Sequence, residues 1–79
     1  MKKTEFLHIF DDAIKNENIK YIEVEVENPQ SSEFTSFGRN MFREEYNYYS
    51  NSYDENMQLN SSKKDKVKNI RLLKNLAEL

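Results

Sequence analysis

Cysteine and tryptophan are absent from the 79-residue sequence, which has only one glycine, one proline and one histidine. Without cysteine the chain can form neither a disulfide framework nor a thiolate zinc site. One glycine is too few for the glycine-rich loops that cradle phosphates. A catalytic triad would have to use His8, which we expect to form a solvated pair with Asp12 four residues later. The sequence therefore predicts a protein that is not an enzyme and uses no cofactor.

Long apolar runs are also missing, since no stretch approaches the ~20 residues that a membrane helix needs. The basic start at residues 1–4 is followed by apolar residues that Glu5, His8 and Asp11 interrupt, which is not typical of an export signal. No spacing of acidic residues and glycine matches a calcium loop. We therefore expect a cytoplasmic protein without a metal site.

The residues that are present suffice for one small hydrophobic core, so we expect a single α+β domain over residues 1–79. Residues 4–15 have the apolar periodicity of an amphipathic helix, with Phe6 and Phe10 on its inner side. Residues 20–27 alternate strictly, as in a half-buried strand that buries Ile22, Val24 and Val26. Residues 33–37 are predicted to form a second strand, paired with the first as a β-hairpin.

Residues 40–53 are predicted to form a second helix with an aromatic stripe. Tyr46, Tyr49 and Tyr53 lie within about 40° of Phe42 on a helical projection, which is typical of a core-facing stripe. Met41 and Tyr48 do not share this direction. Because a large aromatic on water gains little from folding, we expect Tyr48 to be exposed and available to a partner.

The C-terminal part is ambiguous between helix and strand. Ser62 and Asp65 fit a capping box, and Ile70, Leu73 and Leu76 keep helical spacing, so pattern alone favours a helix over residues 64–78. Residues 57–59 and 70–72 can instead form two short strands.

One segment carries a resemblance to known proteins. Its residues are Arg39-Asn40, Tyr48-Tyr49, the run from Tyr53 to Met57, and Leu59. This pattern resembles small uncharacterised phage and prophage accessory proteins of low-GC Gram-positive bacteria. The resemblance implies a strand near residues 57–59 and another near 70–73, and it implies no activity. The 37 Phe, Tyr, Met, Ile, Asn and Lys residues, against seven Gly, Ala, Arg and Pro, agree with a low-GC genome.

Charge is distributed unevenly along the chain. Residues 1–62 contain six Lys or Arg and twelve Asp or Glu, a net charge of −6, whereas residues 63–79 contain six and two, a net charge of +4. A basic segment of this kind can contact the phosphates of a nucleic acid. The candidate contacts are Lys63, Lys64, Lys66, Lys68 and Arg71. The acidic remainder of the chain favours a solvated surface instead.

Binding of a protein partner fits the sequence best, either as an inhibitor of another protein or as a self-associating module. An acidic strand face next to exposed tyrosines could engage a basic protein surface. The candidate residues of this surface are Tyr21, Glu23, Glu25, Glu27, Met41 and Tyr48. The alternative is a small-ligand or nucleotide-binding protein, in which tyrosines stack on a base while Arg39, Arg43 and the C-terminal lysines bind phosphate. Nucleic-acid binding ranks third.

Overall fold

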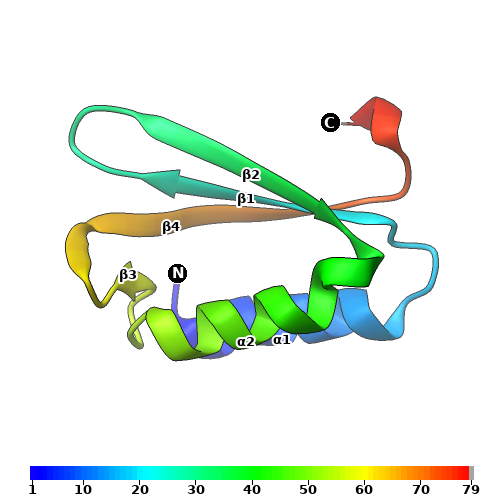
Figure 1. Cartoon of the computed structure of the whole chain (residues 1–79), viewed down its shortest axis with the longest axis horizontal. Coiled ribbons are helices and arrows are strands. Elements are labelled where there is room, and N and C mark those ends of the chain that lie inside the picture. The colour runs from blue at the N-terminus through cyan, green and yellow to red at the C-terminus, as the bar shows by residue number, and fades with distance from the viewer. Residues whose placement is uncertain (79) are drawn as a thin grey trace.

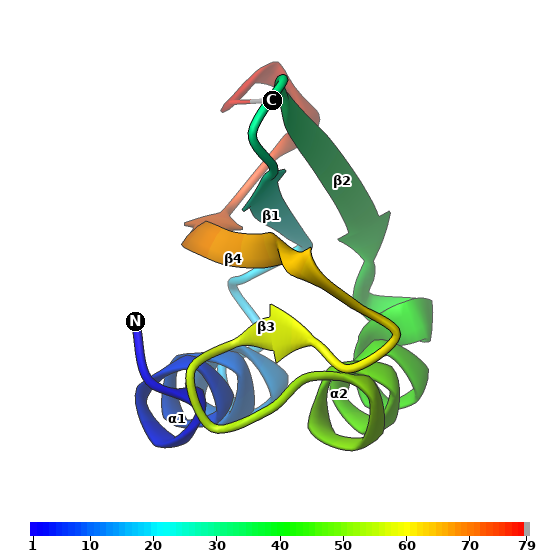
Figure 2. The ribbon, with the colours of Figure 1, turned by 90° about the vertical axis from the view of Figure 1, so that its left-hand side faces the viewer.

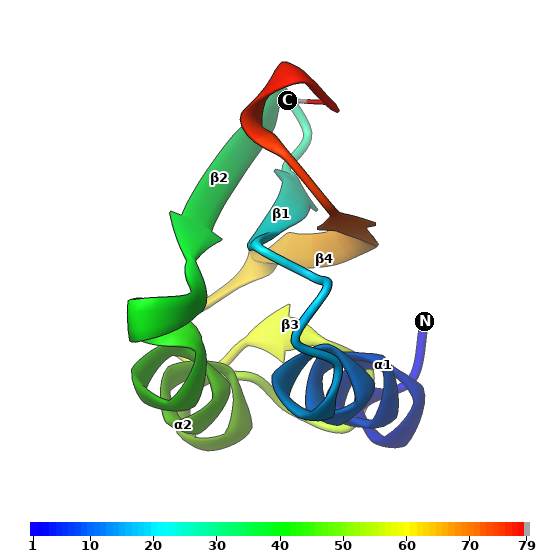
Figure 3. The ribbon, with the colours of Figure 1, turned by 90° about the vertical axis from the view of Figure 1, so that its right-hand side faces the viewer.

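The computed structural model describes residues 1–78, in which two helices cover one face of a four-stranded antiparallel sheet (Figure 1). Both end-on views show the sheet as one layer and the helices as the other, with helix α2 on the side of strand β2 (Figures 2 and 3). In chain order the elements are α1 (Lys3–Lys15), β1 (Tyr21–Glu27), β2 (Ser32–Gly38), the 3-10 turn η1 (Arg39–Met41), α2 (Phe42–Ser52), β3 (Gln58–Leu59), β4 (Ser62–Leu73) and the 3-10 turn η2 (Leu76–Glu78). The expected α+β class is confirmed.

The sheet has the strand order β2-β1-β4-β3, and every neighbouring pair is antiparallel. The predicted hairpin of β1 and β2 is present and runs from the pair Tyr21–Gly38 to the pair Glu27–Ser32. Strand β1 lies in the centre because its alternating residues bury Ile22 and Val24 completely. Strand β2 is left as one edge of the sheet.

The core lies between the inner face of the sheet and the apolar sides of the two helices. Phe6, Phe10 and Phe42 are almost fully buried, as the helical periodicity predicts. Val26 and Tyr46 were expected in the same core and are only partly buried at its margin. None of the helices in the described residues is long and apolar enough to cross a membrane.

The prediction of a helix over residues 64–78 is wrong, and the strand alternative is correct. Residues 62–73 form one long strand that pairs with β1 on one side and with β3 on the other. A β-bulge lies opposite Glu25 and Val26, and it shifts the two-residue alternation so that both Val67 and Ile70 face the core. The spacing of three residues that imitates a helix, at Ile70 and Leu73, has another cause. Ile70 pairs with Val24 and Leu73 with Tyr21, so the two side chains are buried on opposite faces of the sheet.

The two helices run antiparallel, and a basic side chain beside the start of each one caps the end of the other. The Arg39 guanidinium, just before α2, donates four hydrogen bonds to main-chain oxygens at the C-terminal end of α1. The Lys3 ammonium at the start of α1 donates to the main-chain oxygens of Ser50 and Tyr53 at the end of α2. Both cations also complement the negative end of a helix dipole. Helix α1 begins one residue earlier than predicted, at Lys3, and Lys2 occupies its N-cap position.

Candidate functional site

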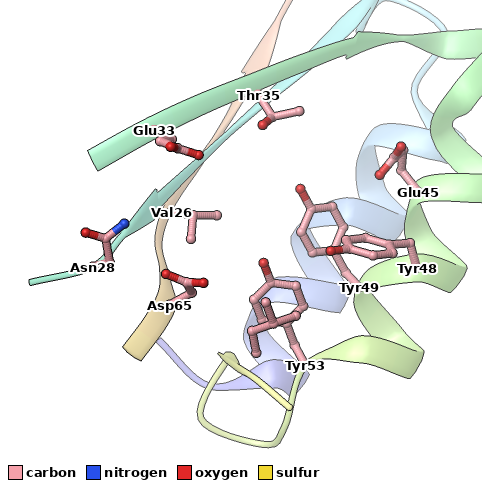
Figure 4. Close-up of a pocket in the computed structure, with 10 residues that line it drawn as sticks. Val26, Asn28, Glu33, Thr35, Glu45, Tyr48, Tyr49, Tyr53 and Asp65 are labelled. Atoms are coloured by element: carbon pink, nitrogen blue, oxygen red, sulfur yellow. The ribbon is translucent and has the colours of Figure 1, made fainter. Parts of the chain in front are cut away.

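A cleft of about 480 Å³ lies between the inner face of the sheet and the second half of α2 (Figure 4). Three acidic side chains and three tyrosines dominate its walls. Its lining residues are Val26, Asn28, Glu33, Thr35, Glu45, Tyr48, Tyr49, Tyr53, Leu59 and Asp65. We call this feature the acid-tyrosine cleft.

Each wall of the cleft follows from the period of the element that forms it. Strand β2 alternates, so Glu33 and Thr35 point inward while Phe34 points to the outer face of the sheet. Helix α2 brings Glu45 and Tyr48, at positions i and i+3, to its side facing the cleft. The pairing of β4 with β1 then places an acidic residue that follows the β3–β4 turn, Asp65, on the opposite wall.

The three tyrosines form a contiguous aromatic cluster at the base of the cleft. The ring centroid of Tyr48 lies 5.1 Å from that of Tyr49 and 6.1 Å from that of Tyr53, both with edge-to-face geometry. Tyr49 is only 3% exposed, yet its hydroxyl points into the cleft (Figure 4). Among residues 1–78, the Tyr49 hydroxyl has no hydrogen-bond partner. Every side-chain polar atom in this range that is fully shielded from solvent does have a partner, so the Tyr49 hydroxyl is reached by solvent. The Tyr49 hydroxyl therefore opens into the cleft as a free donor and acceptor.

The cleft is electronegative, because within the described residues no lysine or arginine lines it. Burial, together with the neighbouring Glu44, raises the pKa of Glu45. Burial also raises the pKa of Tyr53 to about 12, with contributions from Tyr48 and from Asp65. The pKa of Tyr49 rises still further for the same main reason. In all three groups, burial is the main reason that the neutral form is favoured.

The comparisons with known proteins can be stated briefly. No family model, curated protein or solved structure matches this chain. The cleft must therefore be interpreted from its own chemistry.

Tyr48 is 46% exposed, as predicted, and it forms part of the cleft wall. Met41, which we expected to point away from the core, instead packs against it. The reason is that Met41 lies in the 3-10 turn before α2, where a helical projection does not apply. The expectation that Met41 points away from the core is wrong, and the binding role of Tyr48 stays a prediction.

The acidic ladder of β1 lies on the outer face of the sheet, opposite the cleft, and is largely neutralised there. Arg71 of β4 pairs with Glu23 at 3.2 Å between side-chain nitrogen and oxygen, and Lys68 pairs with Glu27 at 3.5 Å. Only Glu25 of the three has no ion pair within the described chain. The ladder is therefore part of a cross-strand charge pattern.

The cations of this charge pattern come from the basic C-terminal residues. Lys63 pairs with Asp54 at 2.7 Å, and Lys68 and Arg71 pair with β1, so three of the five proposed nucleic-acid contacts are already engaged. Lys64 and Lys66 are exposed on the same strand. A continuous basic helical surface, as the C-terminal helix would have formed, does not exist.

The residues expected to bind phosphate are also dispersed. The Arg39 guanidinium is held by four carbonyl oxygens and stacks over the Phe42 ring at 5.0 Å. Arg43 lies in a separate shallow hollow beside Asp11. Tyr21 lines another open hollow with Lys20 and Arg39, remote from the three clustered tyrosines.

Two further observations concern catalysis and metals. His8 and Asp12 form the expected solvated pair at 3.6 Å on the surface of α1. Within residues 1–78, no group of three or more His, Asp or Glu side chains could hold a metal ion.

The sequence did not reveal Glu33, Glu45 and Asp65 as members of one site. For Glu45, the available signal was its position next to the aromatic stripe, three residues after Phe42. For Glu33, the signal was its alternation with Phe34 in the predicted strand. Asp65 had no such signal, because its place depends on the pairing of β4 with β1.

Proposed function

We propose that this protein is a non-enzymatic accessory protein that binds a partner protein, and that the acid-tyrosine cleft receives a basic segment of that partner. The single observation that carries the proposal is the cleft's composition. Three carboxyl groups and three tyrosines line one hollow, and no cation among the described residues balances them. The sequence resemblance to phage accessory proteins supports the accessory role, as part of the same proposal.

A lysine or arginine side chain fits this chemistry. Glu33, Glu45 and Asp65 attract its charge. Its N–H groups can donate hydrogen bonds to the tyrosine hydroxyls, and its methylene chain can lie on the rings. Tyr48 adds a half-exposed aromatic surface at the cleft, and a cation over such a ring gains roughly 0.5–2 kcal/mol. Tyrosine is also enriched among residues that dominate binding energy at interfaces.

The two rival functions receive less support from the same geometry. A nucleotide would bring negative phosphates to a cleft with three acidic residues, and Arg39 is already held by carbonyl oxygens. A nucleic acid would have to displace the ion pairs of Lys63, Lys68 and Arg71.

The test compares two triple variants with the same change in charge. Glu33→Gln, Glu45→Gln and Asp65→Asn together neutralise the cleft, and Glu23→Gln, Glu25→Gln and Glu27→Gln together neutralise the outer ladder. Binding of a fluorescent lysine-rich peptide is measured by anisotropy over a range of salt concentrations. We expect the cleft variant to lose affinity and salt dependence, while the ladder variant retains both.

The controls separate the cleft from net charge. Both variants must keep the circular dichroism spectrum of the wild-type fold. Equal losses of affinity would show that net charge alone attracts the peptide, and absence of binding to the wild-type protein at low salt would remove the proposal altogether.

A further inference from the structure

Strand β2 presents an unpaired edge that borders the cleft. It has seven residues and ends the sheet, so about half of its main-chain N–H and C=O groups point away from β1 toward solvent. It contains no proline or lysine and pairs with β1 in unbroken register. Edge strands in soluble proteins usually carry proline, lysine or a β-bulge, each of which prevents further pairing. The long strand on the other side of the sheet, β4, carries Lys66, Lys68 and Arg71.

The side chains of β2 connect this edge to the cleft. Glu33 and Thr35 point into the cleft (Figure 4). Phe34, which is 62% exposed, pairs with Glu25 and by alternation points to the other face of the sheet. A strand added next to β2 would continue this alternation. Every second side chain of the added strand, at a spacing of about 7 Å, would then project on the cleft side.

We infer that the partner's basic segment binds as an extended strand along the free edge of β2, with alternate lysine or arginine side chains entering the acid-tyrosine cleft. This inference rests on the proposed function and adds the binding mode to it. The main chain of the segment forms hydrogen bonds with β2, and its cations supply the positive charge that balances Glu33 and Glu45. Strand addition of this kind takes affinity from the main chain and specificity from alternate side chains.

The charge of the cleft selects this occupant over a second copy of the chain. A second copy that paired through its own β2 would bring Glu33, the only charged residue of that strand, and no cation to the acidic cleft. Like charges in such positions oppose association. A basic extended segment has the opposite charge and the same main-chain donors and acceptors.

The experiment uses three peptides as long as β2, seven residues each, with alternating lysine and threonine. The parent peptide has an unmodified main chain. In one derivative the lysines are N-methylated on the main chain, and in the other the threonines are. Because N–H groups of successive residues point to opposite edges of a strand, each derivative blocks one edge and leaves the side chains unchanged.

We expect the parent to bind the wild-type protein, one derivative to bind equally well, and the other to lose at least about tenfold in affinity, since two or three main-chain hydrogen bonds are removed. Similar affinities of the two derivatives, whether both high or both low, would overturn strand addition while leaving cleft binding intact. Failure of the parent peptide to bind at low salt would remove the proposed function as well.

Self-association is distinguished by sedimentation of the protein alone. We expect a monomer at all accessible concentrations. A dimer that the Phe34→Lys substitution dissociates would show that a second copy occupies the β2 edge, and the inference would be wrong.

Discussion

Replacement of Arg39 by alanine tests the reciprocal capping of the two helices. The guanidinium donates four hydrogen bonds of 2.7–3.1 Å to main-chain oxygens at and just after the C-terminal end of α1, and it lies over the Phe42 ring. The acceptors are the main-chain oxygens of Ala13, Ile14, Asn16 and Ile19. The oxygens of Ala13 and Asn16 also accept main-chain N–H groups, so truncation leaves chiefly those of Ile14 and Ile19 to water.

The expected cost follows from these contacts. One hydrogen bond to a charged group contributes about 1.5–3 kcal/mol when buried, and a cation–π contact adds about 0.5–1 kcal/mol. Because the guanidinium is only partly buried and water reaches some of the carbonyls, we expect a total loss of about 2–4 kcal/mol rather than the full sum. A domain of this size is stable by roughly 4–12 kcal/mol, so the change is a large fraction of the total. It corresponds to a fall in Tm of about 10–20 °C.

The assay is thermal and urea unfolding followed by circular dichroism. Arg43→Ala is the matched control, because Arg43 is exposed on α2, four residues later, and makes no hydrogen bond or ion pair within residues 1–78; its cost should stay within about 0.5 kcal/mol. Arg39→Lys should recover only part of the stability, since an ammonium cannot reach four acceptors from one plane. Equal Tm values for the two alanine variants would refute the capping argument.

Three further changes extend these expectations. Phe10→Ala should cost ~3–5 kcal/mol of unfolding free energy, measured by urea denaturation, because Phe10 is fully buried among five aromatic rings. Tyr48→Ala should cost only about 1 kcal/mol but weaken binding of a lysine-rich peptide, and an unfolding cost as large as that of Phe10→Ala would place Tyr48 in the core. The Lys63 ion pair and main-chain N–H groups lower the pKa of Asp54 from 3.8 to about 2, so its stabilisation is complete above pH ~4 and is lost as the pH falls through 2. Unfolding curves of Asp54→Asn should lack this part of the pH dependence.

Much of the fold could be predicted from local pattern. The alternation of β1 and the periodicity of α1 are strong because one face of each element is buried and the other is not. The prediction of a helix over residues 64–78 failed for the opposite reason. Ile70 and Leu73, whose spacing favours a helix, are buried on opposite faces of β4, and this burial depends on pairing with another strand, which no local window contains.

The candidate site was less predictable from the sequence than the fold, because it depends more on tertiary structure. Tyr48 could be predicted as exposed because the aromatic stripe of α2 excludes it. The clustering of Glu33, Glu45 and Asp65 could not, since these residues come from three elements whose proximity is decided by the sheet order. Met41 shows the limit of a helical projection at a helix end, where a 3-10 turn replaces the expected geometry.

The uneven charge of the sequence has a structural explanation that bears directly on function. The acidic strand β1 and the basic strand β4 are far apart in the chain but adjacent in the sheet, and their side chains pair on its outer face. Each of these strands, considered alone, has the charge of a binding surface; together they largely cancel. On the inner face, the carboxyl groups of Glu33, Glu45 and Asp65 gather in the acid-tyrosine cleft, and none of the three forms an ion pair within the described residues. A basic segment is therefore attracted to the cleft, beside the edge of β2, which carries no positive charge of its own.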